Sequence, residues 1–158
     1  MLLLRDGEHS LLLTGDARSD KVVHGLVDAG EMKLGGTLAV DTLKMPHHGS
    51  IRNIDAAFVR NVTADQYVLS GDGKHGNPDR ETIDLLLAER PGAPMTLLLT
   101  YPVDVIDAER RREHAKEQRK RVKKGKDAGR EWSDNVDALA TVLLRPPPGV
   151  TVAIVPDA

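Results

Sequence analysis

The chain has 158 residues, 40% of them hydrophobic, which is enough to bury a core as one domain and excludes a wholly disordered protein. It contains no cysteine, which excludes disulfides, thiolate metal ligands and a cysteine nucleophile, and leaves His, Asp and Glu as candidate metal ligands. The formal net charge is −2 and aromatic residues make up only 3%, which argues against a stacking platform for single-stranded nucleic acid.

The sequence gives no sign of a membrane-targeting segment. The apolar run Met1–Leu4 is too short for a signal peptide and meets a charged turn at once. No later segment approaches the length of a membrane span. We therefore expect a cytoplasmic protein that has no membrane partner.

The chain opens with a predicted hairpin and a helix. Two apolar runs, Leu2–Leu4 and Ser10–Thr14, flank an Asp-Gly turn, which is typical of two antiparallel strands. From Ser19 to Ala29 the apolar residues recur at helical spacing, and Gly30 provides a stop.

Strands and helices then alternate as far as residue 100. The predicted strands are Leu38–Leu43, Gln66–Leu69 and Met95–Thr100, and the helices between them are Asp55–Asn61 and Pro78–Arg90. This alternation indicates βαβ units in an α/β fold. In such folds functional residues gather in loops at the carboxyl ends of the strands.

The last third of the chain begins with a charged helix. We expect this helix over Val105–Lys124, as part of an insertion of about residues 105–131 that breaks around Gly125 and Gly129. Ala138–Arg145 and Val150–Val155 resemble two strands joined by a proline-rich turn, which predicts a second hairpin at the end of the chain.

The charged segment allows two interpretations. Residues 107–131 hold eleven Lys and Arg against six acidic residues, which leaves the rest of the chain at −7. These cations could contact a phosphate backbone. The interleaved Glu109, Glu113 and Glu117 have spacings that support i,i+4 ion pairs, so we favour a solvated helical face. We expect Trp132 to anchor the chain as it returns to the sheet.

Three loops, each directly after a predicted strand, hold the candidate functional residues. The first is Thr14-Gly15-Asp16-Ala17, in which Asp16 either points a carboxylate toward a cleft or caps the next helix. The second, Met45-Pro46-His47-His48-Gly49-Ser50, holds adjacent histidines, whose neutral imidazoles suit zinc-like metals unless they are merely solvated. The third runs from Ser70 to Pro78 and contains His75 in what is otherwise a plain turn.

The order and spacing of these loops resemble the metallo-β-lactamase superfamily. The resemblance covers about residues 1–100 and rests on Leu-Leu-Thr-Gly-Asp-Ala followed by Leu-Lys-Met-Pro-His-His-Gly-Ser. More narrowly, the chain resembles the hydrolase domain of the ComEC/Rec2 DNA-uptake proteins. The resemblance implies that Asp16 bridges two metal ions, that His48 is a terminal ligand, and that His47 is an alternative ligand or an orienting neighbour. It also implies that His75 lies near the substrate, although His-Gly-Asn-Pro stands here where relatives often have Gly-His-Pro.

The family's first metal motif, His-x-His-x-Asp-His, does not occur in this sequence. A catalytic zinc needs about three protein ligands and a water, and a pair of ions needs more. Asp16 and one histidine therefore cannot hold such a pair. We expect a single partial domain over residues 1–158, the C-terminal half of an αββα sandwich with a mixed sheet flanked by helices. The alternatives are a fragment, one product of a split gene that pairs with a missing N-terminal half or with itself, and a decayed remnant.

The expected function is a metal-dependent hydrolase of phosphodiesters or other phosphate-containing substrates, with nucleic acid among the candidates. The metal is expected to be zinc, with manganese as the alternative, and a complete site holds two ions. We expect Asp16 and His48 to bind metal, His47 and His75 to orient groups or transfer protons, and Lys44 and Ser50 to touch substrate. The competing hypothesis is a non-catalytic partner or nucleic-acid-binding module derived from the same fold.

Overall fold

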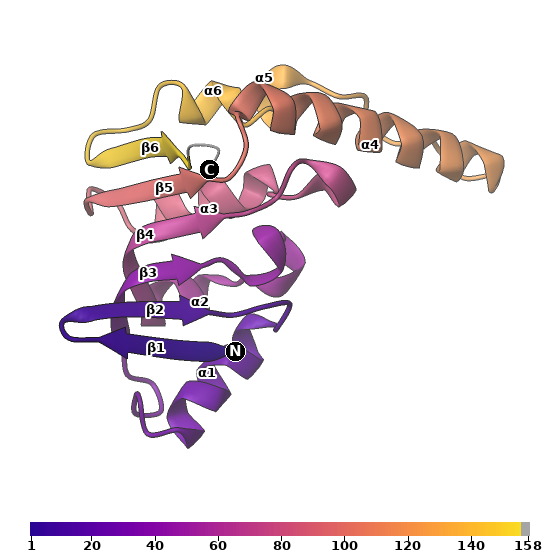
Figure 1. Cartoon of the computed structure of the whole chain (residues 1–158). Helices are drawn as coiled ribbons and strands as arrows, with labels where there is room; N and C mark the ends of the chain where they lie inside the picture. The colour runs from indigo at the N-terminus through magenta and orange to yellow at the C-terminus, as the bar shows by residue number, and fades with distance from the viewer. Residues whose placement is uncertain (156–158) are drawn as a thin grey trace.

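The computed structural model describes residues 1–155 and contains a six-stranded mixed sheet with helices on one face (Figure 1). The strands lie side by side in chain order, and only β1 and β2 pair antiparallel, while every later neighbour is parallel. The bounds are β1 (Leu2–Asp6), β2 (His9–Leu13), β3 (Leu38–Lys44), β4 (Val62–Leu69), β5 (Met95–Leu99) and β6 (Val150–Ile154). The predicted α/β class and the mixed sheet are confirmed.

The helices follow the predicted order as far as the long charged helix. They are α1 (Ser19–Asp28), α2 (Ala56–Asn61), α3 (Arg80–Glu89), α4 (Val103–Lys123), α5 (Asp134–Asp137) and α6 (Ala140–Leu143), with 3-10 turns η1 (Pro46–His48), η2 (Ile51–Asn53) and η3 (Lys74–Gly76). Asp55 caps α2, since its carboxylate accepts a hydrogen bond from the backbone N–H of Phe58 at 2.8 Å. None of the helices in residues 1–155 combines the length and apolar character that a bilayer crossing requires.

The prediction of a strand over Ala138–Arg145 is wrong, and so is the predicted C-terminal hairpin. The segment forms α5 and α6 instead, and β6 pairs with β5 in the parallel direction. Leu139 and Leu143 lie four residues apart and are both buried, as on one side of a helical turn. The carboxylate of Asp107 accepts hydrogen bonds from the backbone N–H groups of Leu139 and Ala140 at 2.8 and 2.9 Å. A distant acidic side chain therefore fixes the start of this helix.

The core lies between the sheet and the helices on its covered face. Leu12, Leu43, Tyr67 and Leu97 are neighbours across β2 to β5 and are 0% exposed. Their helical partners include Val22, Leu26, Phe58, Ile83 and Leu86. The Tyr67 hydroxyl accepts hydrogen bonds from the Ala64 N–H and from Arg90, which satisfies a buried polar group. Burial raises the pKa of Tyr67.

No helix covers the opposite face of the sheet over β1 to β5 (Figure 1). Side chains alternate between the two faces of a strand, so the residues between the core positions point to this side. They include Leu2, Leu4, Leu11, Leu13, Val68 and Leu98, of which Leu2 is 52% and Leu4 46% exposed. We call this surface the open face. The helical cover therefore lies on one side of the sheet only.

Arg110 joins α4 to two other parts of the fold. Its side chain is only 7% exposed and forms an ion pair with Asp107 at 3.2 Å. The same guanidinium donates to the carbonyl oxygen of Gly76 at 3.0 Å and to that of Asp137. The first turns of α4 are thereby fixed against η3 and α5.

We expect Arg110→Ala to lower the free energy of unfolding by about 3 kcal/mol, because it leaves the partly buried Asp107 carboxylate without its ion-pair partner and two carbonyl oxygens without this donor. Urea denaturation measures the change. The control is Arg112→Ala on the same helix, whose side chain is 75% exposed and pairs only with Glu109; it should cost about 0.5 kcal/mol or less. Equal losses in the two variants would contradict the role given to Arg110.

Candidate functional site

The three predicted loops meet at the carboxyl edge of the sheet, and hydrogen bonds connect them. The backbone N–H of His47 donates to the carbonyl oxygen of Gly15 at 2.9 Å. The Asn53 amide donates to the carbonyl oxygen of Asp16 at 3.1 Å, and the Asn77 amide donates to that of His47 at 3.2 Å. The loops after β2, β3 and β4 thus form one connected structure around His47.

The backbone at this edge adopts left-handed conformations that residues other than glycine rarely take. His47, His48 and Gly49 are consecutive left-handed residues, with φ values of 47°, 61° and 89°, and His75 has a φ of 57°. Within residues 1–155 these histidines are the only non-glycine residues with positive φ. Such residues cost free energy, persist where the surroundings hold them, and cluster at functional sites.

Glycine is required at two points of this edge by close packing. A Cβ at Gly49 would lie 2.8 Å from Leu69 Cδ2 and 2.9 Å from Pro78 Cβ, and one at Gly71 would lie 2.6 Å from the Asn77 oxygen. The Gly49 carbonyl oxygen accepts hydrogen bonds from the N–H of Asp79 and the hydroxyl of Thr82. The histidine loop is therefore pressed against β4 and the start of α3.

The hydrogen bonds of Asn53 define which ring nitrogen of His47 carries the proton. The Asn53 nitrogen already donates to Asp16, so the Asn53 oxygen faces His47 Nδ1 at a distance of 3.0 Å. An amide oxygen only accepts, so Nδ1 is protonated and Nε2 carries a lone pair when the ring is neutral. The exposed His47 ring therefore presents an acceptor nitrogen that can bind a metal or take a proton.

His48 and Asp16 also present polar atoms without a hydrogen-bond partner in residues 1–155. His48 is exposed, and its Nδ1 lies 2.9 Å from the Ser70 hydroxyl, which leaves Nε2 available. Asp16 is exposed, and its carboxylate has no hydrogen-bond partner in residues 1–155. It does not cap α1, because Arg18 occupies the N-cap position and no side chain caps that helix. The capping alternative for Asp16 is therefore not observed.

Lys44, Ser50 and His75 occupy different environments. Lys44 is half-buried and donates to the Met45 carbonyl oxygen at 3.3 Å; burial lowers the pKa of Lys44, and the nearby charge of Asp16 opposes that shift. Ser50 is 6% exposed, which leaves its hydroxyl little surface for a substrate. His75 is exposed and lines a pocket outside the Asp16–His48 loops. The roles predicted for these three residues remain predictions.

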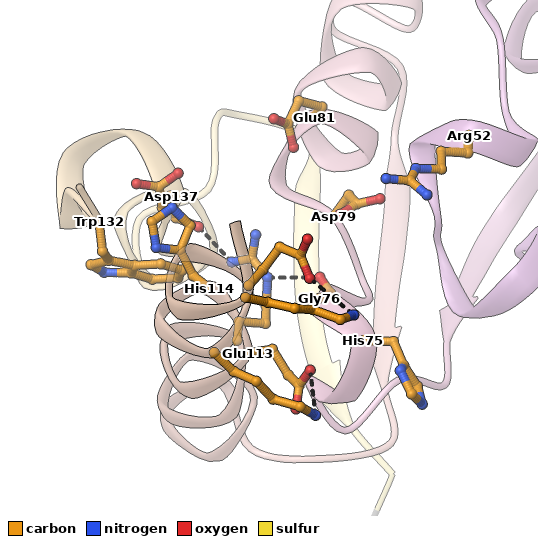
Figure 2. Close-up of a pocket in the computed structure, with 13 residues that line it drawn as sticks. Arg52, His75, Gly76, Asp79, Glu81, Glu113, His114, Trp132 and Asp137 are labelled. Carbon is orange, nitrogen blue, oxygen red and sulfur yellow. Dashed lines mark hydrogen bonds and ion pairs between the residues drawn. The ribbon is translucent and has the colours of Figure 1, made fainter. Parts of the chain in front are cut away.

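The pocket that contains His75 has a volume of about 610 Å³ and lies between the η3 loop and α4 (Figure 2). Figure 2 shows the Asp79 carboxylate pointing toward Arg52. Burial raises the pKa of Asp79, while the hydrogen bond it accepts from the Ile51 N–H at 2.9 Å opposes the increase.

Sequence reasoning did not find this pocket, because its walls come from separate segments. It also missed Asn53 and Asn77, whose only sequence signal is their position beside the two loop motifs.

The side chains at this edge are of the kinds that bind a divalent metal, but there are too few of them to complete its coordination. Carboxylate oxygen and neutral imidazole nitrogen are zinc ligands, and a histidine ligand commonly has its second ring nitrogen held by a hydrogen bond, as in His47 and His48 here. Yet residues 1–155 contain no group of three or more His, Cys, Asp or Glu placed to hold an ion. The described chain by itself does not form a complete metal centre.

Comparisons with known proteins do not assign the chain to a family. No family model matches it, and no solved structure matches it. An alignment 115 residues long, which covers 66% of the chain, is 32% identical to microtubule-associated protein 1A of Homo sapiens. That alignment spans only 4% of the relative's length. The metallo-β-lactamase resemblance therefore remains a prediction from the motifs.

We expect the neutral His47 ring to carry its proton on Nδ1 and Asn53→Ala to release the ring to a mixture of tautomers. Long-range 1H–15N correlation spectra distinguish the two nitrogens, with the His47 signal assigned by its loss in His47→Gln. Asn135→Ala, at an exposed position of α5, should leave the spectrum unchanged. A wild-type His47 protonated on Nε2 instead would show that the assigned hydrogen bond is wrong.

Proposed function

We propose that the chain supplies one side of a metal-dependent hydrolase site for phosphodiesters or other phosphate-containing substrates. The observation that supports this most is the pair His47 and His48, held in left-handed conformations with their Nδ1 atoms anchored and their Nε2 atoms free. The unpartnered carboxylate of Asp16 belongs to the adjoining loop. An arrangement of strained, exposed donors at a sheet edge suits ligand binding better than stability.

In this proposal Asp16 and His48 hold metal, zinc being favoured and manganese the alternative. The ions would lower the pKa of a bound water and polarise the scissile group. His47, with its free Nε2, either adds a ligand or accepts a proton, and Asn53 keeps its ring in the required tautomer. His75 would donate a proton to the leaving group. The ammonium of Lys44 would bind a substrate anion. Ser50 would contact substrate only through the small part of its side chain that is exposed.

The ligands that residues 1–155 lack must come from elsewhere. The sequence-based expectation is a His-x-His-x-Asp-His segment on an N-terminal half, or a second copy of the chain. Two donors, or three with His47, fall short of the number that a two-ion site requires. We therefore propose that hydrolysis needs a partner segment, whereas weak metal binding does not.

The experiment is a zinc titration of the purified chain by isothermal calorimetry. We expect weak binding of zinc that is lost in Asp16→Ala and in His48→Ala, because each removes one of the few available donors. The controls are His24→Ala and His9→Ala, which change exposed histidines outside the carboxyl-edge loops. If the Asp16 and His48 variants bind zinc as the wild type does, the proposed ligands are wrong.

The open face supports the second candidate, a module that pairs with another polypeptide. Exposed contiguous apolar surface of several hundred Å² marks interfaces or aggregation sites, and this face has leucines on β1 and β2 that no helix covers. Such pairing is compatible with an enzyme completed by its partner and with a module that has no activity.

We expect the isolated chain to self-associate through the open face. Sedimentation velocity should show oligomers for the wild type and a shift toward monomer for Leu2→Ser/Leu4→Ser, which makes the face more polar. The matched control is Leu34→Ser/Leu144→Ser, because these leucines are 83% and 70% exposed and lie outside the sheet. A monodisperse wild-type monomer would count against an interface on this face.

A further inference from the structure

The C-terminal end of α4 projects away from the rest of the fold (Figure 1). Every residue from 119 to 127 is exposed, so this part of the helix buries no side chain against the core. It is nevertheless ordered by local contacts: the Gln118 amide donates to the Arg130 carbonyl oxygen and Arg121 to that of Asp127, each at 2.8 Å. We call residues 118–126 the basic tip.

The charge pattern of α4 changes where the basic tip begins. Up to Glu117, acidic and basic residues pair along the helix: Glu109 with Arg112 at 2.9 Å, Glu113 with Lys116 at 2.8 Å and Glu117 with Lys120 at 3.4 Å. These pairs are three residues apart, not the four expected from the sequence. The basic tip then contains six basic residues and no acidic one: Arg119, Lys120, Arg121, Lys123, Lys124 and Lys126.

Most of these cations have no ionic partner in the part of the chain that the structure describes. Within residues 1–155, Arg119, Lys123, Lys124 and Lys126 form no ion pair. Basic residues in the last turn do stabilise a helix through its dipole, which accounts for part of the cluster. However, that effect needs only one or two charges and does not explain Lys126, which lies beyond the end of α4 at Lys123. Six adjacent like charges repel one another unless an anion is bound.

The basic tip adjoins the pocket of Figure 2. Lys116 and Lys120 line that pocket. On a helix, the positions that continue the same face one turn beyond Lys120 are 123 and 124, and both are lysines. A row of cations therefore runs from the wall of the pocket to the end of the helix.

The composition of the basic tip distinguishes between three kinds of anionic partner: a lipid surface, an acidic protein and nucleic acid. Val122 is its only apolar residue, so the helix has no apolar face with which to enter a lipid surface. Protein interfaces depend on buried aromatic, aliphatic or arginine anchors in pockets, whereas the hollow of about 190 Å³ at the tip is lined mainly by charged, polar and small residues, such as Glu117, Arg121 and Gly129. The phosphate backbone of nucleic acid requires only a row of accessible cations.

We propose that the basic tip binds the phosphate backbone of nucleic acid without regard to base sequence. The tip contains no Phe, Tyr, Trp or His, so base stacking contributes nothing there and binding is electrostatic. This inference uses only the charges and geometry of α4 and does not depend on the metal site.

The experiment measures fluorescence anisotropy of short labelled duplexes of two unrelated sequences, titrated with the full chain at increasing KCl concentrations. The tip variant is Arg119→Gln/Lys123→Gln/Lys124→Gln. The control, Lys21→Gln/Lys33→Gln/Arg145→Gln, removes the same charge from exposed residues that have no ion pair in residues 1–155. Thermal melts confirm that both variants fold.

We expect the wild type to bind both duplexes equally, with affinity that falls steeply with salt. Each lost phosphate contact reduces the slope of log K against log salt concentration by about 0.9. The slope should therefore be smaller by about 2.7 in the tip variant and unchanged in the control. The proposal is overturned if both variants lose affinity alike, if the wild type shows no salt-dependent binding, or if polyglutamate competes as well as unlabelled duplex. The last result would assign the surface to an acidic polypeptide.

Discussion

The position of His47 depends on two asparagine side chains that come from different loops. The Asn77 amide donates a hydrogen bond to the His47 carbonyl oxygen. The Asn53 amide oxygen bonds to the His47 ring, and the Asn53 amide nitrogen donates to the carbonyl oxygen of Asp16. A left-handed histidine would otherwise relax toward a commoner conformation. Because these two amides connect the loops after β2, β3 and β4, they keep the exposed donors in place on an edge built of loops and short 3-10 turns.

The core supports this edge directly. Gly49 has no room for a Cβ because Leu69, the last residue of β4, and Pro78 lie against it. Leu69 is itself 0% exposed, so the packing of the sheet continues into the histidine loop without a gap. Packing of the loop's backbone against the core therefore offsets the strain of the left-handed residues.

The sequence predicts those parts of the molecule that depend on local pattern. The alternation of apolar runs with helical spacing identifies β1 to β5 and α1 to α4, and the loop motifs identify the edge where Asp16 and His48 lie. Residues 138–145 were misassigned because their run of Ala, Leu and Val has no clear period, and the Asp107 carboxylate that starts α6 is 32 residues away from Leu139. The pocket beside α4 was missed for the same reason, since Arg52, Asp79 and Lys116 meet only in three dimensions.

The incomplete ligand set and the open face have one common explanation under the proposed function. Lys44 pairs in register with Leu13 and Val68 at the end of the open face, and the charge of Asp16 acts on its ammonium. A polypeptide that covers the leucines of this face would therefore reach the loop of Asp16. It would remove apolar surface from water, which supplies most of the binding free energy, and bring additional side chains beside the exposed donors. Assembly and completion of the site would then be the same event, whereas the basic tip, which projects from the far end of α4, would stay accessible to a polyanion.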